Sequence, residues 1–310
     1  MSKVDVIVPC YNYARFLEEC VRSVLDQSVK DVRVLIIDDA SADESLLVAR
    51  QLAQADPRVT VVGHAENRGH VDTYNEGIAW ASAEYCLLLS ADDLLVPGAL
   101  ERAVEVMDAN SDVVLTYGEG PYWHDDLPCP DIKPMQKYTW ERYDLLKWLC
   151  VTALNISTCT AIARTKIQKT IGGYRASLPH TCDMEMWLRF AANGSVARIN
   201  AVQGLYRKHS AAMSNAYYVD DRMRHFGQVK QAFDSFFDEY ENRLPRRLRI
   251  VARRGPARRM FVSGVGLLVR RHLNDGRRLI RASIDMDPRL RYRPPLWLLL
   301  KVASKMIAKS

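Results

Sequence analysis

The stretch Tyr85-Cys-Leu-Leu-Leu-Ser-Ala-Asp-Asp-Leu-Leu95 decides how this chain folds. Its first five residues form a continuous apolar run, which is typical of a strand buried on both faces of a parallel sheet. The run leads into two adjacent carboxylates, Asp92 and Asp93, and Pro97-Gly98 then restarts the chain as a helix. Open α/β sheets bind their ligands at the carboxyl ends of their strands. We therefore expect these carboxylates to hold a divalent cation and, through it, a diphosphate.

Strands alternate with helices on both sides of this stretch. The predicted strands are residues 4–9, 32–37, 59–63, 85–89 and 112–117. The predicted helices are residues 14–27, 41–55, 71–81 and 97–110. In the second helix Glu44 follows Ser41 by three residues, as in a capping box. This alternation predicts a parallel sheet with right-handed crossovers over residues 1–118.

The regular alternation ends after residue 118. Glycines and prolines interrupt residues 118–134, so neither a helix nor a central strand is expected there. The elements expected further on are helices at 140–150 and 183–193, short strands at 157–163, 196–199 and 202–206, and a turn at 171–174. After Asn215 the pattern becomes helical and basic, with helices expected at about 220–242, 244–273 and 296–308. The change in composition predicts a boundary near residues 214–218.

Composition excludes several classes of protein. The 310 residues are 48% hydrophobic, which is typical of a globular chain with a large core. The seven cysteines are scattered without a Cys-x-x-Cys pair, so we expect buried thiols in a reducing compartment rather than a zinc site. The N-terminus lacks the apolar core of a secretion signal, and no apolar run reaches 18 residues. We expect a cytoplasmic protein, or one held on the inner face of the cytoplasmic membrane.

The net charge of +6 is unevenly distributed. From Arg243 onward the chain holds 19 Lys and Arg against 3 Asp and Glu, whereas the remainder holds 24 basic and 34 acidic residues. Arginines alternate with apolar residues in this tail, which suits an amphipathic element on an anionic membrane surface. A solvated helical face or a dimer contact fits the same pattern. Nucleic acid is not an expected partner, because no basic reader motif with interleaved aromatic residues is present.

Several catalytic motifs are absent. The chain has no Gly-x-Gly-x-x-Gly after its first strand, no Gly-x-x-x-x-Gly-Lys loop, no His-Glu-x-x-His and no Gly-x-Ser-x-Gly. These absences disfavour a nicotinamide enzyme, a P-loop ATPase, a zinc protease and a serine hydrolase. A ligand that carries phosphate would therefore need another source of positive charge, which a metal on Asp92 would supply.

Polar residues follow each of the five predicted strands. They are Tyr11-Asn12, Asp38-Asp39, Asn67-Arg-Gly69, Asp92-Asp93 and Gly118-Glu119. Because the carboxyl ends of neighbouring strands meet at one crevice, we expect these side chains to share a pocket. Each pair alone is also compatible with an ordinary helix start or turn.

As a set, these motifs resemble family 2 glycosyltransferases, inverting enzymes with the GT-A fold. The matching segments are Val6-Ile-Val-Pro-Cys-Tyr-Asn12, Ile36-Ile-Asp-Asp-Ala-Ser41, Glu66-Asn-Arg-Gly69, Asn75-Glu-Gly77, Leu87-Leu-Leu-Ser-Ala-Asp-Asp93 and Thr181-Cys-Asp-Met-Glu-Met-Trp-Leu-Arg189. They occur in the family's order across residues 4–210. The resemblance implies a Rossmann-like, mostly parallel sheet with flanking helices in residues 1–215. Residues 1–118 would bind the nucleotide, residues 119–215 would serve the acceptor and catalysis, and residues 216–310 would form a basic helical region.

The resemblance also implies a role for particular residues. Those on the nucleotide or donor side would be Pro9, Tyr11, Asn12, Asp39, Asn67, Gly69 and Ala91. The carboxylate of Asp39 could accept the ring N–H of uracil or thymine, which favours a UDP- or dTDP-sugar. Asp92 would bind Mg²⁺ or Mn²⁺ with support from Asp93, and His209 matches a histidine that in related enzymes returns to the metal.

Asp183 matches the position of the family's catalytic base. It would take a proton from the acceptor hydroxyl as that oxygen attacks the anomeric carbon, and a single displacement inverts the configuration. The alternative is that Asp183 is only an acid at the N-terminus of a helix, where the helix dipole favours it. Glu185 is a poorer candidate, because Arg189 follows it by four residues and could pair with it.

Two residues depart from the family pattern. Ser90 replaces the first acid of the usual Asp-x-Asp motif, and Tyr74 replaces an arginine often found before the asparagine of the third segment. We predict an inverting, metal-dependent glycosyltransferase that acts on a lipid-linked or cell-surface polysaccharide precursor. The alternative is a catalytically inactive GT-A module that binds a nucleotide or scaffolds a polysaccharide-assembly complex. A nucleotidyltransferase would instead carry a first loop rich in glycine and lysine, which Pro9-Cys-Tyr-Asn12 does not resemble.

Overall fold

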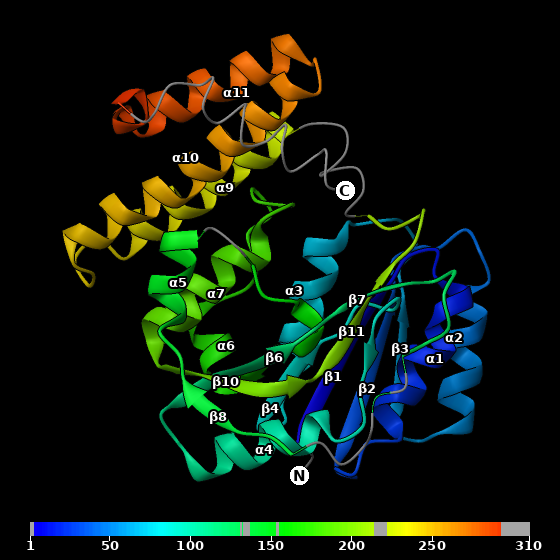
Figure 1. Ribbon diagram of the computed structural model, residues 1–310. Helices are drawn as coiled ribbons and strands as arrows, with labels where there is room; N and C mark the ends of the chain where they lie inside the picture. The colour runs from blue at the N-terminus through cyan, green and yellow to red at the C-terminus, as the bar shows by residue number, and fades with distance from the viewer. Residues whose placement is uncertain (1–2, 131, 133–136, 153–154, 214–221, 293–310) are drawn as a thin grey trace. The chain divides into compact units, whose positions relative to one another are not determined.

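The computed structural model describes residues 3–130, 132, 137–152, 155–213 and 222–292 (Figure 1). The chain divides into two compact units. The first comprises Met1–Leu145 and Asn155–Met213, and the second comprises Leu146–Leu154 and Ser214–Ser310.

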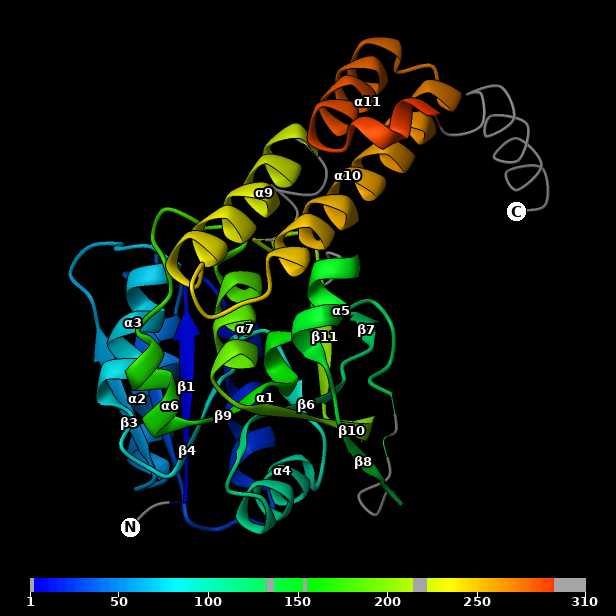
Figure 2. The ribbon, with the colours of Figure 1, turned by 90° about the vertical axis from the view of Figure 1, so that its left-hand side faces the viewer.

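An eight-stranded sheet forms the centre of the first unit. Its order is β3 (Val59–Gly63), β2 (Val32–Asp38), β1 (Val4–Cys10), β4 (Tyr85–Leu88), β9 (Ile162–Arg164), β6 (Val113–Glu119), β10 (Ser195–Val202) and β8 (Trp140–Arg142). The strands β3, β2, β1 and β4 are mutually parallel, as predicted, and β1 and β4 lie side by side in Figure 2. Every residue of β4 is buried, so the apolar run is a central strand.

The sheet differs from the prediction beyond β4. The short strand β9 lies between β4 and β6 and is antiparallel to both, so the parallel sheet is not continuous over residues 1–118. The strand expected at 157–163 begins only at Ile162, because Thr158–Thr160 form a 3-10 turn in which Thr160 hydrogen-bonds the carbonyl of Ser157. The insertion of β9 therefore places a strand from the second half of the first unit at the centre of the sheet.

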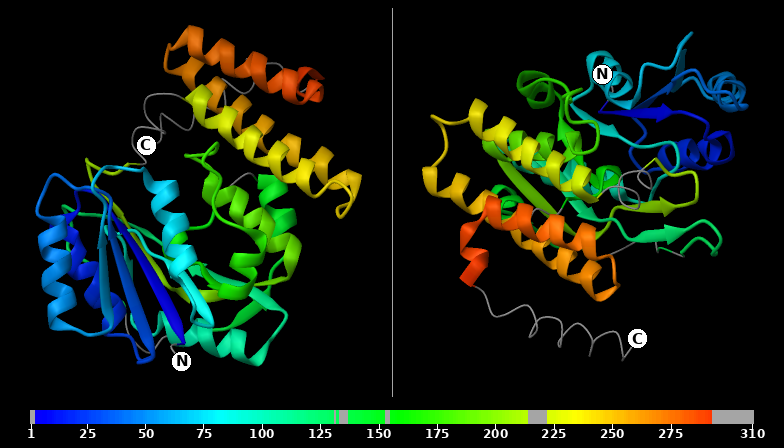
Figure 3. Two further views of the ribbon diagram at one scale, coloured as in Figure 1. Left: turned by 180° about the vertical axis from the view of Figure 1, so that it is seen from behind. Right: turned by 90° about the horizontal axis from the view of Figure 1, so that it is seen from above.

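Four helices connect the parallel strands. They are α1 (Ala14–Leu25), α2 (Ser45–Ala55), α3 (His70–Trp80) and α4 (Ala99–Ala109), and α1 packs against α2 (Figure 3). The predicted capping box is wrong, since α2 begins at Ser45 rather than Ser41. The hydroxyl of Ser41 instead accepts a hydrogen bond from the backbone N–H of Asn12. Ser41 therefore joins two loops and does not start a helix.

The later half of the first unit adds a small second sheet and two helices. The sheet has the order β5 (Leu94–Leu95), β11 (Gly204–Lys208) and β7 (Tyr122–His124). The predicted helix at 183–193 is α7 (Cys182–Asn193), and an unpredicted helix, α6 (Thr165–Ile171), precedes it. The helix expected at 140–150 is shorter, because residues 140–142 form β8 at the sheet edge and α5 spans Leu145–Thr152.

The second unit is helical. It contains all of α5 except Leu145, together with α9 (Arg222–Glu239), α10 (Arg246–Val269), α11 (Leu273–Met286) and the 3-10 helix η2 (Pro288–Tyr292). The helix predicted at 244–273 corresponds to α10, but α11 was not predicted as a separate helix. Glycines bring the two helices close together, since a Cβ at Gly264 would lie 2.9 Å from the carbonyl oxygen of Gly276. The predicted helix at 296–308 lies outside the described residues, and none of the described helices is long and apolar enough to cross a membrane.

Candidate active site

Asp39, at the carboxyl end of β2, organises one side of the site. Its buried carboxylate accepts the backbone N–H groups of Arg68 at 2.8 Å and Gly69 at 2.9 Å. The Nδ1 atom of His64 lies 2.7 Å from its Oδ1, and the amide of Asn67 donates to its backbone carbonyl. Burial acts to raise the pKa of Asp39, but the hydrogen bonds from Arg68, His64 and Gly69 outweigh it and lower the pKa. Asp39 is therefore an ionised carboxylate that shapes the loop at Asn67 and Gly69.

The loop after β1 contacts the loop after β2. Asn12 has a φ of 59°, and its side-chain Oδ1 accepts the backbone N–H of Ala42 at 2.8 Å. Tyr11 beside it is 47% exposed, so its ring is available to a ligand. The carbonyl of Pro9 accepts the N–H of the fully buried Ala91, which joins the β1 loop to the loop after β4. The structure thus brings the predicted donor residues of three strands to one edge of the sheet.

His64 is a site residue that the sequence prediction missed. Its buried ring contacts Asp39 through Nδ1, and its Nε2 lies 3.0 Å from Oε2 of Glu76 on α3. Arg68 pairs with the same carboxylate at 3.2 Å. The available signal was position, since His64 directly follows a predicted strand.

The fifth predicted pair of polar residues, Gly118-Glu119, differs from the other four because it lies inside β6 rather than in a loop.

Asp92 and His209 meet at the end of the opening stretch. The Nε2 atom of His209 lies 3.0 Å from Oδ2 of Asp92. Phe16 and Tyr13 hold the histidine ring, with centroid separations of 4.7 Å and 5.4 Å. Within the described ranges, no group of three or more His, Cys, Asp and Glu side chains is arranged to hold a metal ion. The protein itself therefore offers a pair of potential ligands here.

Asp93 is buried and hydrogen-bonds the backbone of β11. Its Oδ1 accepts the backbone N–H of Arg207 at 3.0 Å, which fixes β11 to this loop. Burial and the nearby charge of Asp92 raise the pKa of Asp93 well above its ordinary value. Arg207, which was not predicted, donates through Nε to the carbonyl of Asp92 at 2.8 Å and packs on the ring of Trp123. Arg207 and Asp93 thus hold Asp92 in place.

Asp183 is the second residue of α7 and is partly buried. Its Oδ1 accepts the backbone N–H of Met184 at 2.7 Å, and the amide of Asn155 donates to its Oδ2. Burial raises the pKa of Asp183 to about 6, although both hydrogen bonds act in the opposite direction. A carboxyl group with a pKa close to neutral is suited to general-base catalysis.

Glu185 faces Arg189, as the four-residue spacing predicted. The buried Oε2 of Glu185 lies 2.8 Å from Nη2 of Arg189, and its Oε1 accepts from Arg175 at 2.9 Å. Arg189 also donates to the carbonyl of Gly173 at 2.8 Å. Glu185 is therefore part of a buried ion-pair network that stabilises the predicted turn at 171–174.

Helix α3 holds the segment that leads into α7. The side-chain amide of Asn75 donates to the carbonyl of Tyr174 at 2.9 Å, and its Oδ1 accepts the N–H of Tyr174 at 2.6 Å. The ring of His70 contacts the carbonyl of Pro179 through Nε2 at 2.7 Å. Because α3 begins next to Gly69, one helix links the Asp39 loop to the Asp183 segment.

Tyr74 packs between two other aromatic side chains. Its ring lies 5.4 Å from the ring of His70 and 5.5 Å from that of Tyr174, measured between centroids. Burial raises the pKa of Tyr74 well above its ordinary value, and the charges of Asp183 and Asp92 add to the increase.

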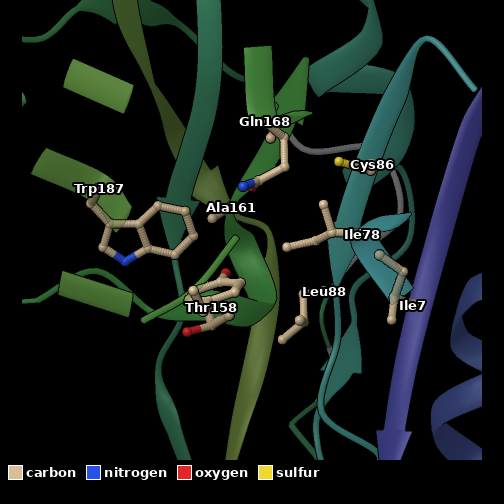
Figure 4. Close-up of a pocket in the computed structure, with 10 residues that line it drawn as sticks. Ile7, Ile78, Cys86, Leu88, Thr158, Ala161, Gln168 and Trp187 are labelled. Carbon is tan, nitrogen blue, oxygen red and sulfur yellow. The ribbon is translucent and has the colours of Figure 1, made fainter. Parts of the chain in front are cut away.

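A small enclosed cavity lies beneath this region. Figure 4 shows apolar side chains from β1, α3 and β4, among them Ile7, Ile78 and Leu88, around a space that Trp187 of α7 borders. Its volume is about 10 Å³, room for roughly one water molecule. This cavity is a packing gap in the core rather than a ligand site.

Comparison with known proteins identifies the family and the fold. Residues 5–171 match the family described as "Glycosyl transferase family 2". An uncharacterized glycosyltransferase of Rickettsia typhi is 29% identical over 214 residues, covering 68% of this chain and 66%, just under two thirds, of that protein.

Two solved structures share the fold. A Pyrobaculum calidifontis mannosyltransferase in complex with GDP-Man and Mn²⁺ has a TM-score of 0.61 at 18% identity, covering 98% of this chain and 80% of that one. S. aureus TarS 1-349 in complex with UDP-GlcNAc has a TM-score of 0.60 at 17% identity, covering 94% and 92%. The predicted GT-A architecture, with its mostly parallel sheet, flanking helices and C-terminal helical region, is thereby confirmed.

Proposed function

Since the chain belongs to glycosyltransferase family 2, we propose that it is an inverting enzyme that transfers a sugar from a UDP- or dTDP-sugar to an acceptor hydroxyl. The observation that carries this proposal is the position of Asp183. It is a partly buried carboxylate at the start of α7 with a pKa of about 6, and hydrogen bonds from Asn75 and His70 of α3 hold the segment that leads to it. A base and a diphosphate-binding acid in one site are what an inverting displacement requires.

In the proposed reaction, Asp183 removes the proton of the acceptor hydroxyl while the acceptor oxygen attacks the anomeric carbon. The bond from that carbon to the donor diphosphate breaks in the same step, and the diphosphate leaves with the bonding electrons. General-base assistance of this kind contributes roughly 10²–10⁴ in rate. Asn155 and the N–H of Met184 hold the carboxylate in position.

Asp92 and His209 fit a cation such as Mg²⁺ or Mn²⁺. Their side chains converge with Oδ2 and Nε2 3.0 Å apart, and Mg²⁺ sites often use one or two protein carboxylates together with substrate phosphates and water. When bound, the ion would neutralise charge on the departing diphosphate. Ser90 leaves this site with one acid fewer than the usual motif, and Asp93 would act only by supporting the loop.

The donor would lie along the edge formed by Pro9, Tyr11, Asp39 and Ala91. The exposed ring of Tyr11 offers a stacking surface, and Oδ2 of Asp39, which accepts the N–H of Gly69, has a second lone pair that could accept a base N–H. Asn67 and Gly69 would border the ribose or sugar, and Asn12 supports the loop through Ala42. TarS was solved with UDP-GlcNAc and the mannosyltransferase with GDP-Man, so the choice of a uridine donor rests on the Asp39 carboxylate.

We assign this function to residues 1–215 and a supporting role to the basic region at 216–310. A lipid-linked or cell-surface polysaccharide precursor would be the acceptor. The strongly basic tail supports a location at the anionic inner face of the cytoplasmic membrane.

The alternative is an inactive module that binds a nucleotide or scaffolds an assembly complex. Ser90 and Tyr74 favour it, because they depart from the family pattern. Nucleotide release measured over a panel of sugar donors, for wild type and Asp183→Asn, separates the two. Release that depends on donor and on Asp183 supports the enzyme. Binding of UDP by calorimetry, with no turnover of any donor, would establish the inactive module.

A further inference from the structure

A groove in the helical second unit has the composition of an anionic-lipid site. It occupies about 600 Å³ and is bordered by α10, α11 and η2. Its main lining residues are Leu273, Arg277, Ile280, Arg281 and Ile284 from α11, with Arg291 from η2. The five α11 residues recur at spacings of three and four, so they share one face of the helix. Ligand sites commonly have volumes of roughly 300–1,000 Å³.

The arginines of this groove are exposed, and their guanidinium groups are available to a ligand. Arg277, Arg281 and Arg291 make no hydrogen bond or ion pair with any other described residue. By contrast, Arg249 on α10 pairs with Asp238 at 2.5 Å. One acid, Asp285, also borders the groove, so three cationic groups face one anionic group. This balance favours an anionic ligand.

The wall behind the arginines is apolar. Ile280 and Ile284 pack against the small core formed by Ala257, Phe261, Val265 and Leu290. Leu273, at the start of α11, is 51% exposed and extends the apolar surface to solvent. Arginine heads beside an apolar floor match a phosphate group attached to a hydrocarbon chain.

Other occupants match this surface less well. Residues 293–310 carry Arg293, Lys301, Lys305 and Lys309 and no acid, so their charge is the same as that of the groove. A nucleic acid would favour aromatic side chains on which bases stack, and the groove is lined by aliphatic residues and arginines.

We propose that the groove between α10, α11 and η2 binds an anionic phospholipid of the membrane surface, with the phosphate between Arg277, Arg281 and Arg291 and the adjoining hydrocarbon on Leu273, Ile280 and Ile284. This inference rests on the proposed membrane location and gives it a specific site.

The test is vesicle co-sedimentation of the full chain. The vesicles are phosphatidylcholine alone, or phosphatidylcholine mixed with phosphatidylglycerol. Arg277→Gln combined with Arg281→Gln removes two charges from the groove. Arg246→Gln combined with Arg247→Gln removes two charges from exposed residues at the start of α10, outside the groove, and is the matched control.

Each arginine near an anionic membrane contributes about 1 kcal/mol, so the groove variant should bind the mixed vesicles about 30-fold more weakly than wild type. The control should stay within about threefold of wild type, because its arginines would not meet the phosphate. Leu273→Ser should weaken binding about fivefold without a change in charge, since it removes part of the hydrocarbon contact. Melting curves should show that all variants remain folded.

Equal losses in the two arginine variants would overturn the proposal, because attraction would then depend on overall charge. Wild-type affinity in the groove variant would also overturn it and would assign the groove to another occupant, such as residues 293–310 or a second copy of the chain. If wild type does not co-sediment with the anionic vesicles, the proposed membrane location is wrong as well. Sugar transfer to a soluble acceptor tests the catalytic proposal separately.

Discussion

Replacing Asn75 by alanine should impair catalysis without weakening donor binding. Asn75 makes two hydrogen bonds to the backbone of Tyr174, at 2.6 Å and 2.9 Å, and these fix the segment that leads to Asp183. Each such hydrogen bond contributes about 0.5–1.5 kcal/mol net. Loss of both should therefore loosen the segment by about 1–3 kcal/mol, which corresponds to a fall in kcat of roughly 5- to 150-fold.

The pH dependence provides a second readout for Asn75→Ala. Wild-type kcat/KM should rise with pH up to about 6 and then level off, because Asp183 acts as a base only when deprotonated. Burial is the main cause of that raised pKa. A loosened segment admits water to the carboxylate, so the rising limb should move to lower pH in the variant.

Steady-state transfer assays measured across pH, with the KM for the donor, test this expectation. Asn75→Asp should show an intermediate effect, since a carboxylate still accepts the N–H of Tyr174 but cannot donate to its carbonyl. Lys169→Ala is a suitable control, because Lys169 donates to the carbonyl of Ala79 on α3 at 3.1 Å and does not hold this segment. A variant Asn75→Ala with kcat within twofold of wild type and an unmoved pH limb would refute the positioning role.

Three further predictions concern stability and metal binding. Folding raises the pKa of Asp183 from 3.8 to about 6, so its ionisation costs stability as pH rises through that window; Asp183→Asn should gain up to about 3 kcal/mol at neutral pH and little below pH 3.8, as thermal melts would show. Gly173→Ala should lose about 1–3 kcal/mol in denaturant unfolding, since the new Cβ would lie 2.3 Å from Oδ1 of Asn75, whereas Gly227→Ala meets no atom within 4 Å and should lose none. Chelation should abolish transfer, and His209→Ala should raise the Mn²⁺ concentration for half-maximal activity by about tenfold or more; equal Mn²⁺ dependence in both proteins would remove His209 from the site.

The elements that depend on a local sequence pattern could be predicted from the sequence. A continuous apolar run can only be buried on both sides, so Tyr85–Leu88 identified the central strand β4 and placed Asp92 at its carboxyl end. Helical spacing located α7 and the pairing of Glu185 with Arg189. These features depend on residues close together in the chain.

The remaining features depend on long-range contacts that have no local pattern. The antiparallel strand β9 enters the sheet between β4 and β6 from about fifty residues further along the chain than β6, so sequence order could not place it. Ser41 and Glu44 look like a helix start, but the hydroxyl of Ser41 forms a contact with Asn12 instead. His64, Arg207 and Asn75 gain their roles only from residues that the fold brings to them.

The assignment of Asp183 as the base is tested most directly by comparing Asp183→Asn with wild type in two measurements on the same preparation. Nucleotide release from the preferred donor in the presence of acceptor should fall by about 10²–10⁴, because the acceptor hydroxyl loses its base. Calorimetry with UDP and Mn²⁺ should give the same affinity for both proteins, because Asp183 does not hold the donor in this mechanism. Unchanged turnover in Asp183→Asn would contradict the assignment.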